Sequence, residues 1–213
     1  MKKFIHKRDV AAAYDGKDRR KRDDFESYFN AQYDARPRHI LPGQSEMSDD
    51  NREMITANIA YGVGVGIYDP DQGRGSFAYV SVPQNFLDSF PDFKALDITQ
   101  RKIITAPIKN AITVLIGDKE DTDHLRVRLT GASQSDFAPH DPGTKNYIFV
   151  KEYIARQGLR ILNEDIGGSY ARRVCFFPST GRLVRIILRR HSDFELIAKD
   201  CGAYEEEFLA STR

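Results

Sequence analysis

The stretch that decides the fold is Gly62-Val63-Gly64-Val65-Gly66-Ile67, followed by the turn residues Asp69-Pro70-Asp71-Gln72-Gly73. Strict alternation with glycine predicts a β-strand whose two valines and isoleucine share one face. The Asp/Pro/Gly run predicts a turn, and Ser76–Val82 then reads as the returning strand of a hairpin. Three glycines on the opposite face weaken a strand. That bare face must therefore lie under a closely packed ring, a backbone or a ligand.

Two helices and four further strands are predicted after this hairpin. The first helix is Thr105–Ile116, with Thr105 as its N-cap and Pro107 in its first turn. The second helix is near Lys145–Gln157 and stops at Gly158. The further strands are Leu125–Leu129, Leu159–Leu162, Arg173–Phe177 and Leu183–Leu188. Because this order is not a regular βαβ alternation, it favours an α+β sandwich with mixed sheets.

Charge and apolar content divide the chain into three parts. Residues 1–38 are predicted to form a charged and mobile N-terminal arm, with a short helix near Asp24–Gln32 that offers aromatic residues for docking. Residues 39–190 are expected to form the packed domain, and residues 191–213 an acidic, helical tail. The basic run Lys17–Arg22 either stays solvated or contacts an acidic partner.

The overall composition is that of a soluble globular protein. The chain has 213 residues, 40% of them hydrophobic, and its net charge is only +1, so no global field favours nucleic acid or an anionic membrane. No apolar run approaches the ~20 residues of a membrane helix, so no membrane insertion is expected. The basic start lacks a hydrophobic stretch behind it, which argues against a secretory signal. Two cysteines, Cys175 and Cys201, favour a reducing cytoplasm over a disulfide framework.

No motif for a cofactor or a metal is recognised. The glycine run at Gly62–Gly66 lacks the Lys-Ser/Thr pair of a phosphate-binding loop, and no helix follows it directly. The five histidines are scattered without metal-ligand spacing, so no metal site and no cofactor are expected. Cys175 alternates within an apolar strand and is expected to be buried there. Glu164–Gly168 is interpreted either as a plain turn or as a backbone loop shaped around a site.

Seven short pieces of the sequence recur in an order that resembles one known family. They are Tyr28–Asn30 through His39–Gly43, Met54–Val65, Tyr68–Pro70 with Gly75–Pro83, Leu129–Ser133, Gly143–Asn146, Ile161–Gly168 and Phe176–Leu183. From about Tyr28 to Leu188 the chain resembles the bacterial chemoreceptor glutamine deamidase family CheD. The resemblance implies an α+β fold, a CheD-like sandwich of two mixed β-sheets with flanking helices.

The resemblance also implies a chemistry that this chain lacks the residues to perform. The family uses a cysteine thiolate, activated by a histidine and positioned with a threonine, to hydrolyse receptor glutamine amides and glutamate methyl esters. Its threonine matches Thr56, but its cysteine position matches Gly62 and its histidine position matches Tyr79. No cysteine precedes Cys175, so no shift of register restores the nucleophile. A phenol, with a reference pKa near ~10, is a poor base at neutral pH compared with imidazole near ~6.5.

The sequence therefore predicts a cytoplasmic chemotaxis protein that has lost catalysis, a pseudoenzyme. By the resemblance, its partners are the cytoplasmic helical bundle of chemoreceptors or a CheC-type phosphatase, with no nucleic acid. The remnant site comprises Thr56, Gly62 and Tyr79, and the residues expected to line it for binding are Tyr61, Gly64, Gly131, Ala132, Ser133, Glu164, Asp165, Gly167 and Gly168. The rings of Tyr61 and Tyr79 are expected to lie over Gly62 and Gly64. The alternative is an active hydrolase that uses another group, with Thr56, His124 or His140 nearby.

Overall fold

The computed structural model describes residues 35–82, 96–117, 121–134 and 141–188. The helix predicted near Asp24–Gln32, His140, Cys201 and the tail 191–213 lie outside these residues. The division into arm, domain and tail therefore stays a prediction. None of the described helices is long and apolar enough to span a membrane.

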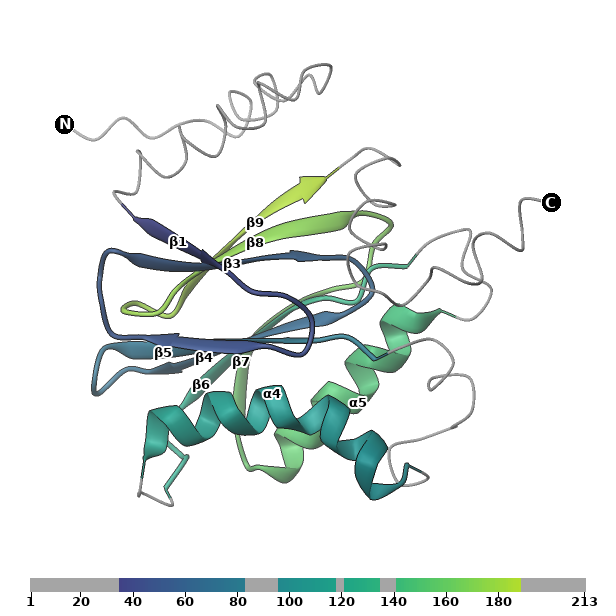
Figure 1. Ribbon diagram of the computed structural model, residues 1–213, viewed down its shortest axis with the longest axis horizontal. Coiled ribbons are helices and arrows are strands. Elements are labelled where there is room, and N and C mark those ends of the chain that lie inside the picture. The colour runs from purple at the N-terminus through teal and green to yellow at the C-terminus, as the bar shows by residue number, and fades with distance from the viewer. Residues whose placement is uncertain (1–34, 83–95, 118–120, 135–140, 189–213) are drawn as a thin grey trace. The chain divides into compact units, whose positions relative to one another are not determined.

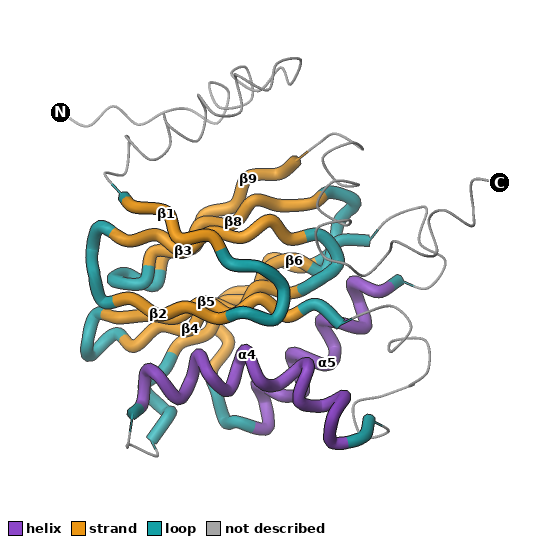
Figure 2. Tube along the Cα trace, in the orientation of Figure 1, coloured by secondary structure: helices purple, strands orange, loops and turns teal. Residues whose placement is uncertain are grey.

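Two β-sheets lie one on the other, and two helices cover the far face of one of them (Figure 1). The four-stranded sheet has the order β1 (Arg36–His39), β3 (Glu53–Ile59), β8 (Ala171–Phe177) and β9 (Arg182–Leu188). The five-stranded sheet has the order β2 (Ser45–Ser48), β5 (Arg74–Val80), β4 (Val63–Asp69), β6 (Arg126–Gly131) and β7 (Arg160–Ile166). The helices are α4 (Ile98–Ile116) and α5 (Pro142–Arg156), drawn in purple in Figure 2.

Strand pairing confirms the predicted α+β sandwich with flanking helices. In the five-stranded sheet, β4 pairs antiparallel with both β5 and β6, whereas β6 and β7 run parallel, so this sheet is mixed. In the four-stranded sheet, β8 pairs antiparallel with β3 and with β9. The predicted hairpin is the β4–β5 pair, and it forms the centre of the five-stranded sheet.

The apolar face of β4 packs against the helices, as its alternation predicts. Val63, Val65 and Ile67 are fully buried in one core cluster with Ile108 of α4 and Phe149 of α5. Burial of each such side chain contributes roughly 1.5–3 kcal/mol relative to leaving it exposed. This cluster fixes the helices on the outer face of the five-stranded sheet.

The glycine face of β4 points at the four-stranded sheet and lies under rings. A Cβ atom on Gly66 would lie only 2.9 Å from the ring of Phe176, and one on Gly64 would lie 2.6 Å from the ring of Phe77. The rings of Phe77 and Phe176 stack with their centroids 5.6 Å apart. The sequence left three explanations for the bare face, a ring, a backbone or a ligand. Along β4 the structure shows close packing by rings.

Two element boundaries differ from the sequence-based expectation. Helix α4 begins at Ile98, so Thr105 is not its N-cap and Pro107 lies inside it. The apolar stripe extends to the buried Ile104, and tertiary packing outweighs the lost hydrogen bond at proline. Strand β7 runs to Ile166, so Glu164 and Asp165 belong to a strand and only the two glycines after it form the turn.

Replacement of Gly66 by alanine tests the ring packing between the sheets. We expect Gly66→Ala to lower the free energy of unfolding by roughly 1–3 kcal/mol, because the new methyl group overpacks the ring of Phe176. In a Phe176→Leu background the same substitution should cost clearly less, since the three atoms nearest the new Cβ all belong to Phe176. Urea unfolding of the four proteins measures both costs. Equal costs in the two backgrounds would contradict this account.

Candidate functional site at the corner between the sheets

The candidate site lies where the chain passes from β3 in one sheet to β4 in the other. At this corner the backbone N–H of Ala132 donates to the carbonyl of Gly62 at 2.7 Å, and that of Ser133 donates to the carbonyl of Ala60 at 2.9 Å. A Cβ on Gly131 would collide with the Gly62 carbonyl. The loop after β6 therefore clamps the corner through main-chain bonds, without using a side chain at position 62.

The clamp holds one residue in an unusual backbone conformation. Ala132 has φ 51°, in the left-handed region, and Gly131 before it has φ 115°. A non-glycine residue there costs on the order of 1–3 kcal/mol, and such strain collects at functional sites. Ala132 is buried and both of its neighbours are hydrogen-bonded, which explains how the fold sustains it.

A buried arginine that the sequence analysis did not single out organises the surrounding loops. Arg172 on β8 is 5% exposed, and its Nη1 donates to the Gly131 carbonyl at 3.0 Å and to Ser133 Oγ at 2.7 Å. Its Nη2 donates to the carbonyl of Gly167, and its Nε lies 3.3 Å from Asp165 Oδ2. Burial lowers the pKa of this guanidinium, while the Asp165 carboxylate opposes that shift.

The sequence did contain a signal for Arg172. Strand β8 alternates, and the residues that share the inward face with Arg172 are Val174 and Phe176, both fully buried. A charged residue at an inward position of such a strand must have partners. The alternation thus predicts a buried arginine with acceptors, although it does not say which acceptors.

The structure brings together most of the residues expected to line the remnant site, but not all of them. Around Arg172 and the Gly62 carbonyl it gathers Gly131, Ala132, Ser133, Asp165, Gly167 and Gly168. Glu164 points to the opposite face, where it accepts a hydrogen bond from Tyr147 and pairs with Lys151 at 3.0 Å. That hydrogen bond from Tyr147 lowers the pKa of the Glu164 carboxyl. Glu164 is therefore not part of the corner.

Tyr79 lies over Gly62 as expected, whereas the expectation for Gly64 was wrong. A Cβ on Gly62 would lie 2.6 Å from Tyr79 Cε2 and equally close to the backbone oxygen of Val80. Tyr79 is 1% exposed and belongs to the core between the sheets. The ring against Gly64 is that of Phe77, not that of Tyr61. In the β4–β5 register Tyr79 stands opposite Gly64 and Phe77 opposite Gly66, so each ring leans diagonally, Tyr79 toward Gly62 and Phe77 toward Gly64.

Thr56 lies away from this corner, on the outer face of the four-stranded sheet. Its neighbours Ile55 and Ala57 point into the core between the sheets, so Thr56 points the other way. There its Oγ1 lies 3.2 Å from Nδ1 of His39. Its cross-strand partner on the same face is Cys175, which is buried as expected. The structure thus separates Thr56 from Gly62 and Tyr79.

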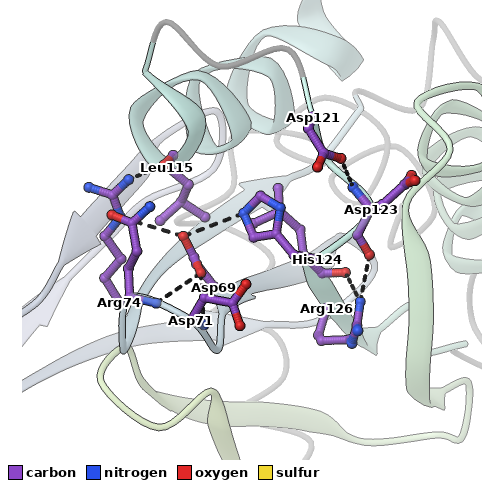
Figure 3. Close-up of polar contacts among 10 residues, drawn as sticks. Asp69, Asp71, Arg74, Leu115, Asp121, Asp123, His124 and Arg126 are labelled. Carbon is purple, nitrogen blue, oxygen red and sulfur yellow. Dashed lines mark hydrogen bonds and ion pairs between the residues drawn. The ribbon is translucent and has the colours of Figure 1, made fainter.

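A second polar cluster surrounds Asp69 and His124 at the other end of β4 (Figure 3). One oxygen of the fully buried Asp69 carboxylate accepts backbone N–H bonds from Asp71 and Gln72 and so shapes the turn. The other oxygen lies 3.5 Å from His124 Nε2 and 3.8 Å from Arg74 Nε. Asp69 stands seven positions after Gly62, about 23 Å along an extended strand. His124 is therefore not brought to the corner.

No metal centre is evident in the described ranges. Within them, no three or more His, Cys, Asp or Glu side chains are grouped so that they could hold a metal ion. The chemistry available at the corner is that of backbone carbonyl and N–H groups, one buried guanidinium and one carboxylate. Such a set binds and orients polar groups, and it contains no thiol or imidazole.

Fold and corner together define a two-sheet α+β protein with a loop site that is held by main-chain bonds and one buried arginine. The family model described as CheD chemotactic sensory transduction matches residues 105–186, from α4 to β9. A probable chemoreceptor glutamine deamidase CheD of Halorhodospira halophila is 26% identical over 172 residues, covering 78% of this chain and 77% of the relative. The Bordetella parapertussis counterpart is 27% identical over 194 residues, covering 87% of each. The chain is thus similar to CheD proteins over most of its length, and to the CheD family model over its second half.

Two further matches add little to this similarity with CheD proteins. A CheD 2 of Burkholderia thailandensis is 43% identical over 63 residues, which is 30% of this chain and 32% of that protein. A crystal structure of a Neisseria meningitidis protein covers 82% of this chain and 83% of its own with a TM-score of 0.47 and 10% identity, too low to bear on function. The range matched by the family model omits β3, β4 and β5. Thr56 and Tyr79 lie in β3 and β5, and Gly62 directly precedes β4, so the family model matches none of the three positions.

Replacement of Arg172 tests whether it holds the corner together. Arg172→Met should lower the free energy of unfolding by about 3 kcal/mol or more, because it leaves Asp165 and several acceptors without their buried partner. Arg173→Met is the matched control. Its side chain lies on the other face of β8 and donates to Asn58 at 3.0 Å, so we expect a loss below about 1.5 kcal/mol. Chemical unfolding measures both, and equal losses would contradict the role of Arg172.

Proposed function

We propose that this chain is a non-catalytic member of the CheD family that acts by binding, either to the cytoplasmic helical bundle of chemoreceptors or to a CheC-type phosphatase. One observation carries the proposal. The space in which a nucleophilic side chain at position 62 would begin is taken by the ring of Tyr79 and the backbone oxygen of Val80. A cysteine does not fit there without movement of the backbone.

Loss of both members of a nucleophile–base pair removes the covalent route. Amide hydrolysis by a thiolate needs the nucleophile and a base within hydrogen-bond reach of each other. Glycine supplies no nucleophile, and removal of a single member of comparable catalytic sets already costs several orders of magnitude in rate. Tyr79 is also buried at 1% exposure, so its hydroxyl is not offered to a protein substrate.

The corner supports binding because its shape does not depend on the lost side chains. Backbone bonds from Ala132 and Ser133 and the guanidinium of Arg172 hold the loops. Beside them Tyr170 is 48% exposed, and its carbonyl accepts a hydrogen bond from Ser133 Oγ at 2.6 Å. An exposed aromatic ring on a well-anchored loop is a typical anchor of protein interfaces.

A second candidate, an active hydrolase with a relocated nucleophile, has one observation in its favour. Thr56 contacts His39 at 3.2 Å and stands opposite Cys175 across the strand pair, so a thiol, a hydroxyl and an imidazole share the outer face of one sheet. Cys175 is only 2% exposed, which counts against attack on a receptor glutamine. The first proposal is therefore preferred.

An activity assay separates the two candidates. We expect the wild-type chain to leave receptor glutamines and glutamate methyl esters unchanged, under conditions in which a cysteine-bearing CheD converts them. Mass spectrometry of chemoreceptor cytoplasmic fragments measures the conversion. Conversion by the wild type would overturn the proposal. Loss of that conversion in Cys175→Ser but not in Cys201→Ser would then identify Cys175 as the relocated nucleophile.

A binding assay tests the positive half of the proposal. The wild type should bind receptor fragments and slow their conversion by a cysteine-bearing CheD, and Tyr170→Ala should weaken this binding about tenfold or more. Ile98→Ala, at a 74% exposed position on α4, is the control and should change nothing. Binding to a CheC-type phosphatase instead of the receptor would select the second partner. Binding to neither would refute the proposed function.

A further inference from the structure

The inner face of the five-stranded sheet changes character from one strand to the next. Over β4 and β5 it consists of glycines and aromatic rings, but over β6 and β7 it is charged. Arg126 and Arg128 stand opposite Tyr68 and Gly66, on the face that points at the other sheet. Arg160 of β7 stands beside Arg126. A sandwich interior is normally apolar, so this half of the face requires an explanation.

Two more arginines from the other sheet join this surface. Arg185 of β9 forms an ion pair with Asp165 of β7, and Arg172 of β8 contacts the same carboxylate. We name the set Arg126, Arg128, Arg160, Arg172, Arg185 and Asp165 the arginine face. It follows the β7–β9 side of the sandwich, where both sheets end.

The arginine face is strongly positive although the chain as a whole is almost neutral. Of its five guanidiniums, that of Arg172 is buried, and those of the other four arginines belong to side chains that are at least partly exposed. Within the described part of the chain, the ion pairs of these arginines all go to Asp165. Arg126 donates to the carbonyls of Asp123 and Leu125, and Arg128 donates to that of Gly181 at 3.0 Å. These bonds hold the side chains in place without neutralising their charge. The net charge of the whole chain is +1.

We propose that the arginine face is a docking surface for a carboxylate-rich helical segment of a protein partner. The spacing fits such a segment. Neighbouring arginines along β6 stand about 6.6 Å apart and those across to β7 about 4.8 Å apart, while carboxylates three or four residues apart on a helix stand about 5–6 Å apart. Arginine forks match carboxylates in paired hydrogen bonds.

The choice of a protein segment over nucleic acid rests on the overall charge of the chain. Nucleic-acid-binding domains are usually strongly basic overall, and this chain is not. The helical class of partner rests on the proposed function, because the receptor bundle named there is helical. The negative charge expected of the partner, in contrast, is inferred from the positive residues of the arginine face alone.

The test uses the full chain and a labelled helical peptide with glutamates at three- and four-residue spacing, with a glutamine version of the same peptide as its counterpart. Fluorescence anisotropy measures affinity for both. We expect the glutamate peptide to bind, to weaken as salt screens the charges, and to lose about tenfold or more in affinity with Arg160→Glu. The matched control Lys109→Glu, exposed on α4, makes the same change of charge elsewhere and should bind as the wild type does.

The same variants in the receptor-binding assay separate the two proposals. Receptor binding that Arg160→Glu leaves unchanged overturns the docking surface and leaves the proposed function standing. Loss of glutamate-peptide binding in Arg160→Glu, without any receptor binding, keeps the docking surface and refutes the proposed receptor partner. Tighter binding of a DNA duplex than of the peptide overturns the proposal in favour of nucleic acid. Peptide binding that appears only after Glu205, Glu206 and Glu207→Gln assigns the face to the chain's own tail instead.

Thermal unfolding shows whether a variant loses peptide binding only because it is less stably folded. Arg160 is exposed and makes no ion pair within the described residues, so Arg160→Glu should unfold at the wild-type temperature. Arg185→Glu is a second variant that acts on the same face from the other sheet. Reduced peptide binding in both variants, with unfolding unchanged in at least Arg160→Glu, supports the docking surface. Wild-type binding in both variants refutes it.

Discussion

The structure depends on close contact between the glycine face of β4 and the aromatic rings that cover it. Packed sheets normally interdigitate side chains from both inner faces. Here one strand contributes no side chain at Gly62, Gly64 or Gly66, and the rings of Tyr79, Phe77 and Phe176 occupy that space. Each ring buries a large apolar area, which offsets the conformational cost of glycine within a strand. The rings can pack between the two sheets because β4 has no side chains on its inner face.

The same constraint divides the interior of the sandwich into two halves. Where β4 is bare, rings from β5 and β8 meet and exclude water. Beyond it, Arg128 of β6 reaches the turn before β9 and Asp165 of β7 pairs with Arg185 of β9, while Arg172 stands at the boundary between the apolar and the charged half. From this boundary it also reaches the corner loops. The corner and the arginine face are therefore connected through a single buried guanidinium.

Alternation of residues made the central part of the fold predictable from the sequence. It identified β4, its buried valine face and the buried Cys175, and it narrowed the glycine face to three explanations. It did not show the start of α4, because proline inside a helix reads as a boundary when tertiary packing is unknown. Alternation also did not show that Thr56 points out of the sandwich while Gly62 lies at its inner corner. The chain changes sheets near Ala60, and the alternation of inward and outward residues along β3 does not continue through that corner into β4. Alternation along β8 marks Arg172 as an inward residue, but it does not identify its partners, which are carbonyls and side chains of distant segments.

Under the proposed function, loss of the catalytic pair is compatible with retention of the corner because different groups serve the two purposes. The corner is held by main-chain bonds to Gly62 and Ala60 and by Arg172, none of which needs a thiol or an imidazole. Active-site residues are commonly held at some cost to stability. A buried tyrosine ring over glycine removes such a cost, since it fills the space and buries apolar area. A chain under selection for binding alone would gain stability from this exchange while keeping the loops that a partner contacts.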